Sequence, residues 1–107
     1  MDLSLPRGLR DLGPDDYEAL ERVRSTFIAV AKVFDFRLME PSPIEKLHIL
    51  ESKSGPGIRE EVYHFKDKGG REVGLRFDLT IGLTRYISSD RGLPLPVKLG
   101  AFSSMWR

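Results

Sequence analysis

Residues 74–80, with the sequence GLRFDLT, are the stretch that decides the expected fold and the expected site. The segment begins with the pattern of a β-strand and ends, at Thr80, with the pattern of a helix start. In an extended strand, alternate side chains share a face. One face is therefore apolar and the other polar, with Val73, Leu75, Phe77 and Leu79 opposite Arg76, Asp78 and Thr80. We predict that the apolar face seals a core.

The polar face of this stretch has two interpretations. The first is a site for a small zwitterion, in which the carboxylate of Asp78 takes an ammonium group and the hydroxyl of Thr80 orients it. A buried carboxylate needs either a protein cation or a charged ligand. The second is structural: Thr80 caps the following helix, Asp78 favours the positive end of its dipole, and Arg76 pairs with Asp78. The residues alone leave both open.

The composition is that of a soluble globular chain. With 107 residues, 40% apolar and 31% charged, it is one domain or a piece of one. A net charge of +1 gives no basic field typical of a nucleic-acid binder. No apolar run approaches the roughly 18 residues that span a bilayer, and the N-terminus lacks a secretory signal pattern. The lack of cysteine excludes disulfides and fits a reducing compartment. We expect a cytoplasmic protein without a membrane partner.

A long helix is expected in the first third of the chain. Residues 2–13 read as an irregular lead-in, and Pro14 suits the first turn of a helix. From there the apolar residues step by three or four to about Phe34. They form one stripe, comprising Tyr17, Leu20, Val23, Phe27, Val30 and Phe34. The stripe predicts core packing, and part of it could face a partner subunit.

Residues 35–50 predict a strand followed by a short helix. Residues 35–40 read as a strand with Phe36 and Leu38 buried. The sequence SPIE at residues 42–45 fits a capping box, with a proline at the first helical position. The helix should then run to about Leu50.

The second half predicts a hairpin, a helix and a last strand. After a loop at residues 52–57, strands at 61–67 and 72–77 flank a Lys-Gly-Gly turn. A helix should follow over 80–89, and a last strand over 97–107. In that strand Arg107 would share a face with small side chains, where its planar fork could bind phosphate or carboxylate. The alternative is a terminal arginine in solvent.

Metal and phosphate motifs are missing from the sequence. His48 has no Asp, Glu or His at ligand spacing, so we predict no protein-bound metal. The glycine-rich loop at residues 52–57 is not followed by the Gly-Lys-Ser/Thr of a phosphate-binding loop.

Five segments together resemble the start of a histidyl-tRNA synthetase, a class II aminoacyl-tRNA synthetase. Their order and spacing, over nearly the whole chain, make the resemblance specific. They are an Arg-Gly-x-x-Asp-x-x-Pro signature at residues 7–14, a motif 1 helix and strand at 15–40, a hairpin at 61–69, an amino-acid-recognising segment at 75–80 and the first strand of motif 2 ending at 105–107.

The resemblance implies a fold and a domain arrangement. The fold would be α+β, a partial class II synthetase fold with an antiparallel sheet flanked by helices, ending in the first strand of motif 2. Residues 1–107 would be the N-terminal part of the catalytic domain, and the anticodon-binding domain would be absent. The motif 1 region would contribute to a homodimer interface.

The resemblance also implies site residues and a reaction. Asp78 would bind the α-ammonium of histidine, with Leu79 and Thr80 beside it, and Arg107 would be the catalytic arginine that grips the α-phosphate of ATP. The full-length protein would use ATP with Mg²⁺ to form histidyl-adenylate and then charge tRNA(His). A piece holding half of the pocket is expected to be inactive alone and, because a cut sheet exposes edges and apolar faces, to self-associate.

One departure and two alternatives accompany the resemblance. Ser42 stands where the motif 1 proline is expected, between Pro41 and Pro43, which puts the dimer contact in doubt more than the fold. The first alternative is the synthetase-like regulatory subunit of ATP phosphoribosyltransferase. The second is a dimerisation or folding module without a ligand. The intact Asp-Leu-Thr segment and Arg107 favour the synthetase.

Overall fold

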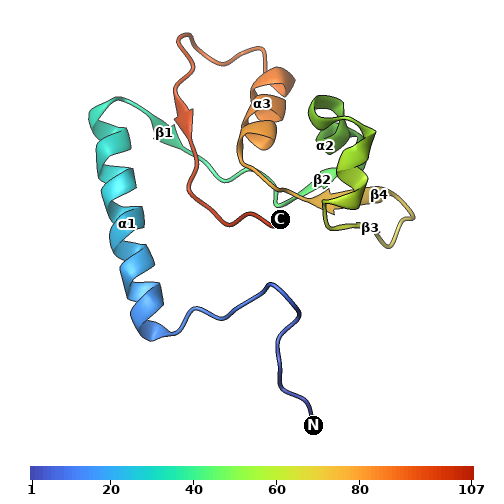
Figure 1. Ribbon diagram of the computed structural model, residues 1–107. Coiled ribbons are helices and arrows are strands. Elements are labelled where there is room, and N and C mark those ends of the chain that lie inside the picture. The colour runs from blue at the N-terminus through green and yellow to red at the C-terminus, as the bar shows by residue number, and fades with distance from the viewer.

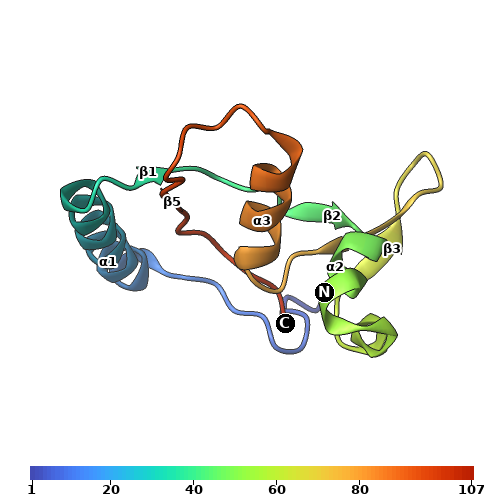
Figure 2. The same ribbon diagram turned by 90° about the horizontal axis from the view of Figure 1, so that it is seen from above.

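The computed structural model describes residues 1–107 and shows a long helix at one side of an α+β unit (Figures 1 and 2). Helix α1 (Pro14–Val33) lies at one side, and α2 (Leu47–Ser54), α3 (Thr80–Ser89) and a three-stranded sheet lie at the other. The molecule measures 50 × 38 × 24 Å along its principal axes. Only 10 of 107 residues are buried, so the core is small and much apolar surface is open.

Helix α1 matches the predicted helix, and the irregular lead-in before it is confirmed. Pro14 opens the helix, Asp15 and Asp16 occupy its first turn, and Lys32 lies in its last turn, as the helix dipole favours. None of its residues is buried within this chain. The predicted core packing of its apolar stripe is therefore wrong: all six residues of the stripe are exposed, from 37% for Leu20 and Phe27 to 62% for Phe34.

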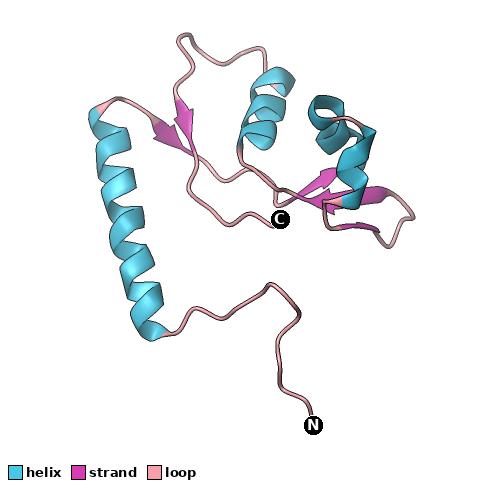
Figure 3. Ribbon diagram, in the orientation of Figure 1, coloured by secondary structure: helices cyan, strands magenta, loops and turns pink.

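Two small sheets organise the rest of the chain (Figure 3). In the antiparallel sheet, β4 (Glu72–Leu75) lies between β2 (Ile44–Lys46) and β3 (His64–Lys66). The second sheet is a parallel pair of β1 (Arg37–Leu38) and β5 (Leu99–Gly100). The β3–β4 hairpin was predicted, whereas the parallel pair was not.

Two predictions for residues 35–50 are wrong. The capping box fails because Ile44–Lys46 pairs with β4, so the helix begins only at Leu47. Ser42 instead forms two hydrogen bonds with the backbone of Ile44. The predicted burial of Phe36 and Leu38 also fails: they are 38% and 37% exposed, because neighbouring side chains, among them Lys98 over the Phe36 ring, cover them only in part.

Two further predictions need correction. The segment expected to be a loop is helical on both sides of Gly55, since α2 reaches Ser54 and a 3₁₀ helix, η1, spans Pro56–Glu60. The last strand is only Leu99–Gly100, and residues 101–107 are irregular. The alternation that placed Arg107 on a face with small residues therefore does not apply.

A compact apolar cluster holds α2, α3 and η1 together. Its buried members are Leu47, Leu50, Val62 and Ile81. Ile49, Ile58 and Phe77 pack against it. Phe77 is thus fixed by the core on one side while its backbone leads into the segment that was singled out in the sequence. No helix combines the length and apolar character needed to cross a membrane.

The β3–β4 turn carries a pH-dependent contact. One carboxylate oxygen of Asp67 accepts the backbone N–H groups of Gly69 and Arg71, each at 2.9 Å, and the other accepts Nε of Arg71 at 2.8 Å. These contacts, foremost the Arg71 N–H, lower the pKa of Asp67 below its ordinary value. A lowered folded-state pKa means that the contact stabilises the fold above the unfolded pKa and is lost as the pH falls through the folded pKa.

We therefore expect the turn to loosen only under acid conditions. In NMR titrations the Gly69 and Arg71 amides should shift together with a midpoint below about 3.9, the unperturbed value of Asp. Asp67→Asn should remove that step from both amides. A midpoint at or above the unperturbed value would contradict the role of these hydrogen bonds.

Candidate functional site

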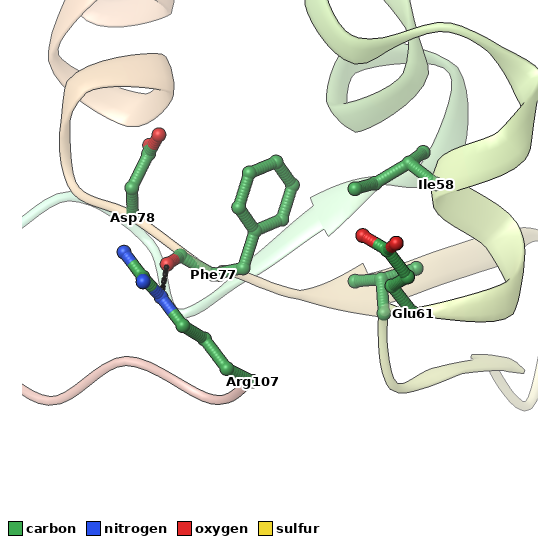
Figure 4. Close-up of a pocket in the computed structure, with 6 residues that line it drawn as sticks. Ile58, Glu61, Phe77, Asp78 and Arg107 are labelled. Carbon is green, nitrogen blue, oxygen red and sulfur yellow. Dashed lines mark hydrogen bonds between the residues drawn. The ribbon is translucent and has the colours of Figure 1, made fainter.

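A cavity of about 380 Å³ opens between η1, the end of β4 and the end of the chain (Figure 4). It is lined by Ile58, Glu61, Val62, Phe77, Asp78 and Arg107. Three of these side chains are apolar and three are charged, two acidic and one basic. The cavity therefore offers an apolar wall beside groups of both signs, as a small zwitterionic ligand requires.

Asp78 is fixed by the start of α3 yet keeps acceptor capacity. Its Oδ1 accepts the backbone N–H of Ile81 at 3.1 Å, which satisfies one of the free donors in the first helical turn. Its Oδ2 makes no hydrogen bond within the protein. The structural interpretation placed Asp78 at the positive end of the helix, and this contact supports it. It also predicted that Thr80 caps the helix, which is wrong, because Thr80 is the first residue of α3 and its side chain forms no capping hydrogen bond.

Arg107 reaches the same cavity from the end of the chain. Its Nε donates to the carbonyl oxygen of Phe77 at 3.2 Å, which orients the guanidinium beside the segment that carries Asp78 (Figure 4). The two terminal nitrogens have no partner within the protein, and no ion pair joins Arg107 to Asp78. A carboxylate and a guanidinium thus share one cavity without neutralising each other, and each can still meet a group of opposite charge.

The predicted pairing of Arg76 with Asp78 is wrong. Arg76 is 5% exposed and pairs with Glu40, with Nη1 and Oε2 3.2 Å apart. Because β4 ends at Leu75, the strict alternation of a strand does not continue through Asp78. The two residues consequently point into different surroundings.

Leu79 and Thr80 lie next to the cavity but do not line it. Leu79 is half-buried at the start of α3, and Thr80 is exposed as its first residue. Of the residues singled out in the sequence, the structure brings together Asp78 and Arg107.

The sequence model of the histidyl-tRNA synthetase family matches residues 8–107. The chain belongs to the histidyl-tRNA synthetase family. The resemblance seen in the sequence is therefore confirmed.

Curated relatives carry the name histidine–tRNA ligase. The protein of Pyrobaculum islandicum is 39% identical over 102 residues, which cover 95% of this chain and 24% of that protein. The protein of Methanospirillum hungatei is 38% identical over 103 residues, or 95% of this chain and 25% of that protein. The chain thus spans about a quarter of the length of the curated relatives it matches.

Solved structures share the fold of this chain. Histidyl-tRNA synthetase from S. aureus superposes with a TM-score of 0.83 at 22% identity, over 99% of this chain and 30% of that one. A Bacillus halodurans protein described as an ATP phosphoribosyltransferase regulatory subunit/histidyl-tRNA synthetase gives 0.86 at 18%, over 100% of this chain and 28% of that one. The expected α+β fold is confirmed.

Sequence reasoning did not identify Ile58, Glu61 and Val62 as lining residues of this cavity. Ile58, Glu61 and Val62 reach the site because η1 turns the chain back after α2. Glu61 and Val62 were placed at the start of the predicted strand 61–67, whereas β3 begins only at His64. Ile58 lay between that strand and the predicted loop at residues 52–57. The proline at the start of η1, which also suits a first helical turn, is the one local signal that pointed to it.

Proposed function

We propose that this chain forms part of the site in which a histidine–tRNA ligase activates histidine. The observation that carries the proposal is the convergence of Asp78 and Arg107 on one cavity, with acceptor and donor capacity left on each. Membership of the family and the names of relatives at 38–39% identity support it. The proposed activity is that of a longer protein, since the chain spans about a quarter of those relatives.

The two charged side chains have distinct proposed roles. Asp78 would accept the α-ammonium of histidine through Oδ2, with Leu79 and Thr80 at the rim of the site. Arg107 would hold the α-phosphate of ATP, whose Mg²⁺ enters with the nucleotide as part of the substrate. An arginine fork suits a phosphate because its N–H groups meet two oxygens at once.

The reaction then follows from placing these groups around the substrates. A carboxylate oxygen of histidine would attack the α-phosphorus, a new P–O bond would form, and pyrophosphate would leave. Arg107 would stabilise the charge that builds on the phosphate oxygens, while Asp78 holds the amino acid in line. Catalysis of this kind depends on positioning and fixed charges. The histidyl group would afterwards pass to tRNA(His).

The regulatory alternative receives less support. The Bacillus halodurans neighbour that carries the regulatory-subunit description is 18% identical, which supports a shared fold alone. The relatives at 38–39% identity are named as ligases. We therefore favour the ligase.

The ammonium contact can be tested with ligands that differ at one group. We expect histidine to bind in calorimetric titrations, and imidazole lactate, which replaces the ammonium with a hydroxyl, to bind about tenfold more weakly, because a charge-assisted hydrogen bond is lost. Histidinol, which keeps the ammonium and lacks the carboxylate, should lose less affinity in the absence of ATP. Equal affinity for histidine and imidazole lactate would contradict the proposed role of Asp78.

We also propose that the stripe on α1 packs against a second copy of the chain. Large apolar side chains along α1 are open, among them Val23, which is 58% exposed. An apolar face of this length is a usual mark of an interface. The isolated chain is therefore expected to self-associate.

Light scattering with two matched variants tests this expectation. Val23→Glu, in the stripe, should lower the mean mass toward that of a monomer. Ser25→Glu introduces the same charge on the opposite side of α1 and should leave the mass unchanged. A stable monomer of the unsubstituted chain in dilute solution would contradict the proposal.

A further inference from the structure

Arg76 is the most fully engaged charged side chain of the molecule, and the proposed reaction assigns it no part. It is 5% exposed, and its guanidinium donates in three directions. Nε donates to the carbonyl oxygen of Ser104 at 2.8 Å, and Nη2 to the hydroxyl of Ser103 at 2.6 Å. Nη1 donates to the carbonyl oxygen of Pro41 at 2.7 Å and to Glu40 at 3.2 Å.

The contacts of Arg76 form a closed network around residues 103–106. The hydroxyl of Ser103 donates onward to Glu40 at 2.8 Å, so acid, hydroxyl and guanidinium join in a ring. The backbone N–H of Trp106 donates to the carbonyl oxygen of Arg76 at 3.0 Å. The guanidinium also lies 5.6 Å from the centre of the Trp106 ring, within cation–π distance.

This network holds an otherwise irregular segment. Residues 101–107 belong to no helix or strand, so no sheet ladder fixes their path. Arg107 directly follows the bonded residues, and Asp78 lies two residues after Arg76. The buried side chain of Arg76 therefore connects the two segments that carry the proposed contacts to ATP and to histidine.

We propose that Arg76 is a positioning residue that fixes residues 103–107 and so places the Arg107 guanidinium at the cavity. The role in binding rests on the proposed function, whereas the fixing of the segment does not. An arginine is required because its planar fork supplies five N–H donors in set directions, whereas a lysine ammonium is a single point with three. Arg76→Lys keeps the positive charge and loses most of the directed N–H donors of the guanidinium.

The connection also extends to the region of the long helix. Glu40 and Pro41 follow β1, which follows α1 directly. A shift of α1 and β1 would therefore move Glu40 and Pro41, which accept hydrogen bonds from Arg76. Through the side chain of Arg76, the network connects the proposed α1 interface with the segment that carries Arg107.

The test uses Trp106, the single tryptophan of the chain, as a local reporter. The variants are Arg76→Lys and Ser103→Ala, the second of which leaves the buried charge in place and removes only the hydroxyl of the ring. Arg71→Lys is the matched control, because Arg71 pairs with Asp67 in the β3–β4 turn and touches no part of the 103–107 segment. Circular dichroism establishes that each variant is folded at the temperature used.

We expect both network variants to red-shift the Trp106 emission and to increase its quenching by acrylamide, while Arg71→Lys leaves both unchanged. ATP affinity should fall about tenfold in the network variants, as expected for a lost charge-assisted contact. Histidine affinity should stay within about twofold, because Asp78 is held by α3. A general loss of structure would lower both affinities together.

The outcomes separate this proposal from the proposed function. Unchanged emission and quenching in folded Ser103→Ala and Arg76→Lys would overturn the positioning role. An altered Trp106 signal in a chain that binds neither ligand would support the fixing of the segment and would count against the proposed function alone.

Discussion

Replacing Arg85 with methionine is expected to lower the free energy of unfolding by about 3 kcal/mol. Glu45 on β2 is 5% exposed, and its carboxylate pairs only with Arg85 on α3, at 2.7 and 2.8 Å. Arg85→Met leaves that buried carboxylate without a partner, and such a group costs far more than the ion pair contributed. Chemical denaturation followed by circular dichroism measures the loss.

Two further variants establish the cause of that loss. Arg71→Met removes an arginine whose side chain is 73% exposed and whose partner is Asp67, so it should cost at most about 1 kcal/mol. Glu45→Gln combined with Arg85→Met should recover much of the stability, because no buried charge remains. Equal losses for Arg71→Met and Arg85→Met would contradict the account of the β2–α3 contact.

The second large effect is expected at Gly82, within α3. A Cβ at this position would lie 2.7 Å from the Cβ of Pro41, whose ring is fully buried and has few ways to move. Alanine is favoured over glycine in a helix by about 1 kcal/mol, yet overpacking typically costs 1–3 kcal/mol. We expect the clash to prevail, so that Gly82→Ala destabilises the fold by about 1–2 kcal/mol.

A substitution at a glycine with open surroundings is the control for the steric effect at Gly82. Gly92 lies beyond α3 in open structure, and a Cβ there would meet only the side chain of Asp90, at 3.3 Å. Gly92→Ala should change stability by less than about 0.5 kcal/mol. A gain in stability from Gly82→Ala would show that Pro41 moves aside and would contradict the close packing of α3 on that residue.

The elements that the sequence predicts well are those specified by local pattern. The apolar spacing of α1, the Lys-Gly-Gly turn of the hairpin and the helix over Thr80–Ser89 all lie where periodicity and turn residues placed them. Each of these depends on interactions within about a dozen residues. Local preference and the final structure agree in these elements, so they can be predicted from the sequence alone.

The elements that the sequence predicts poorly depend on distant partners. The parallel pairing of β1 with β5 joins Arg37 to Leu99. The sequence of neither segment indicates the other as its pairing partner. At residues 42–45 a good capping pattern was overridden, because strand pairing with β4 and the Glu45–Arg85 ion pair hold the segment extended. Tertiary contacts decided these cases against local preference.

The candidate site shows both situations. Asp78 and Arg107 were singled out from residue type and family resemblance, and the structure brings them to one cavity. The assumed continuation of strand alternation misassigned the partner of Arg76, whose true partners lie on two distant segments. Glu61 was missed because it was assigned to the predicted strand 61–67, whereas β3 begins only at His64 and Glu61 directly follows the 3₁₀ helix.

Asp78 is the residue proposed to supply the ammonium contact for histidine. The most direct measurement is calorimetric titration of histidine, with ATP present, into the chain and into Asp78→Asn. Asparagine caps a helix about as well as aspartate, so this change removes the charge and keeps the contact to Ile81. Asp67→Asn, in the β3–β4 turn, is the matched control.

We predict that Asp78→Asn weakens histidine binding at least about tenfold, whereas Asp67→Asn leaves it unchanged. Equal histidine affinity in the unsubstituted chain and in Asp78→Asn would contradict the claim.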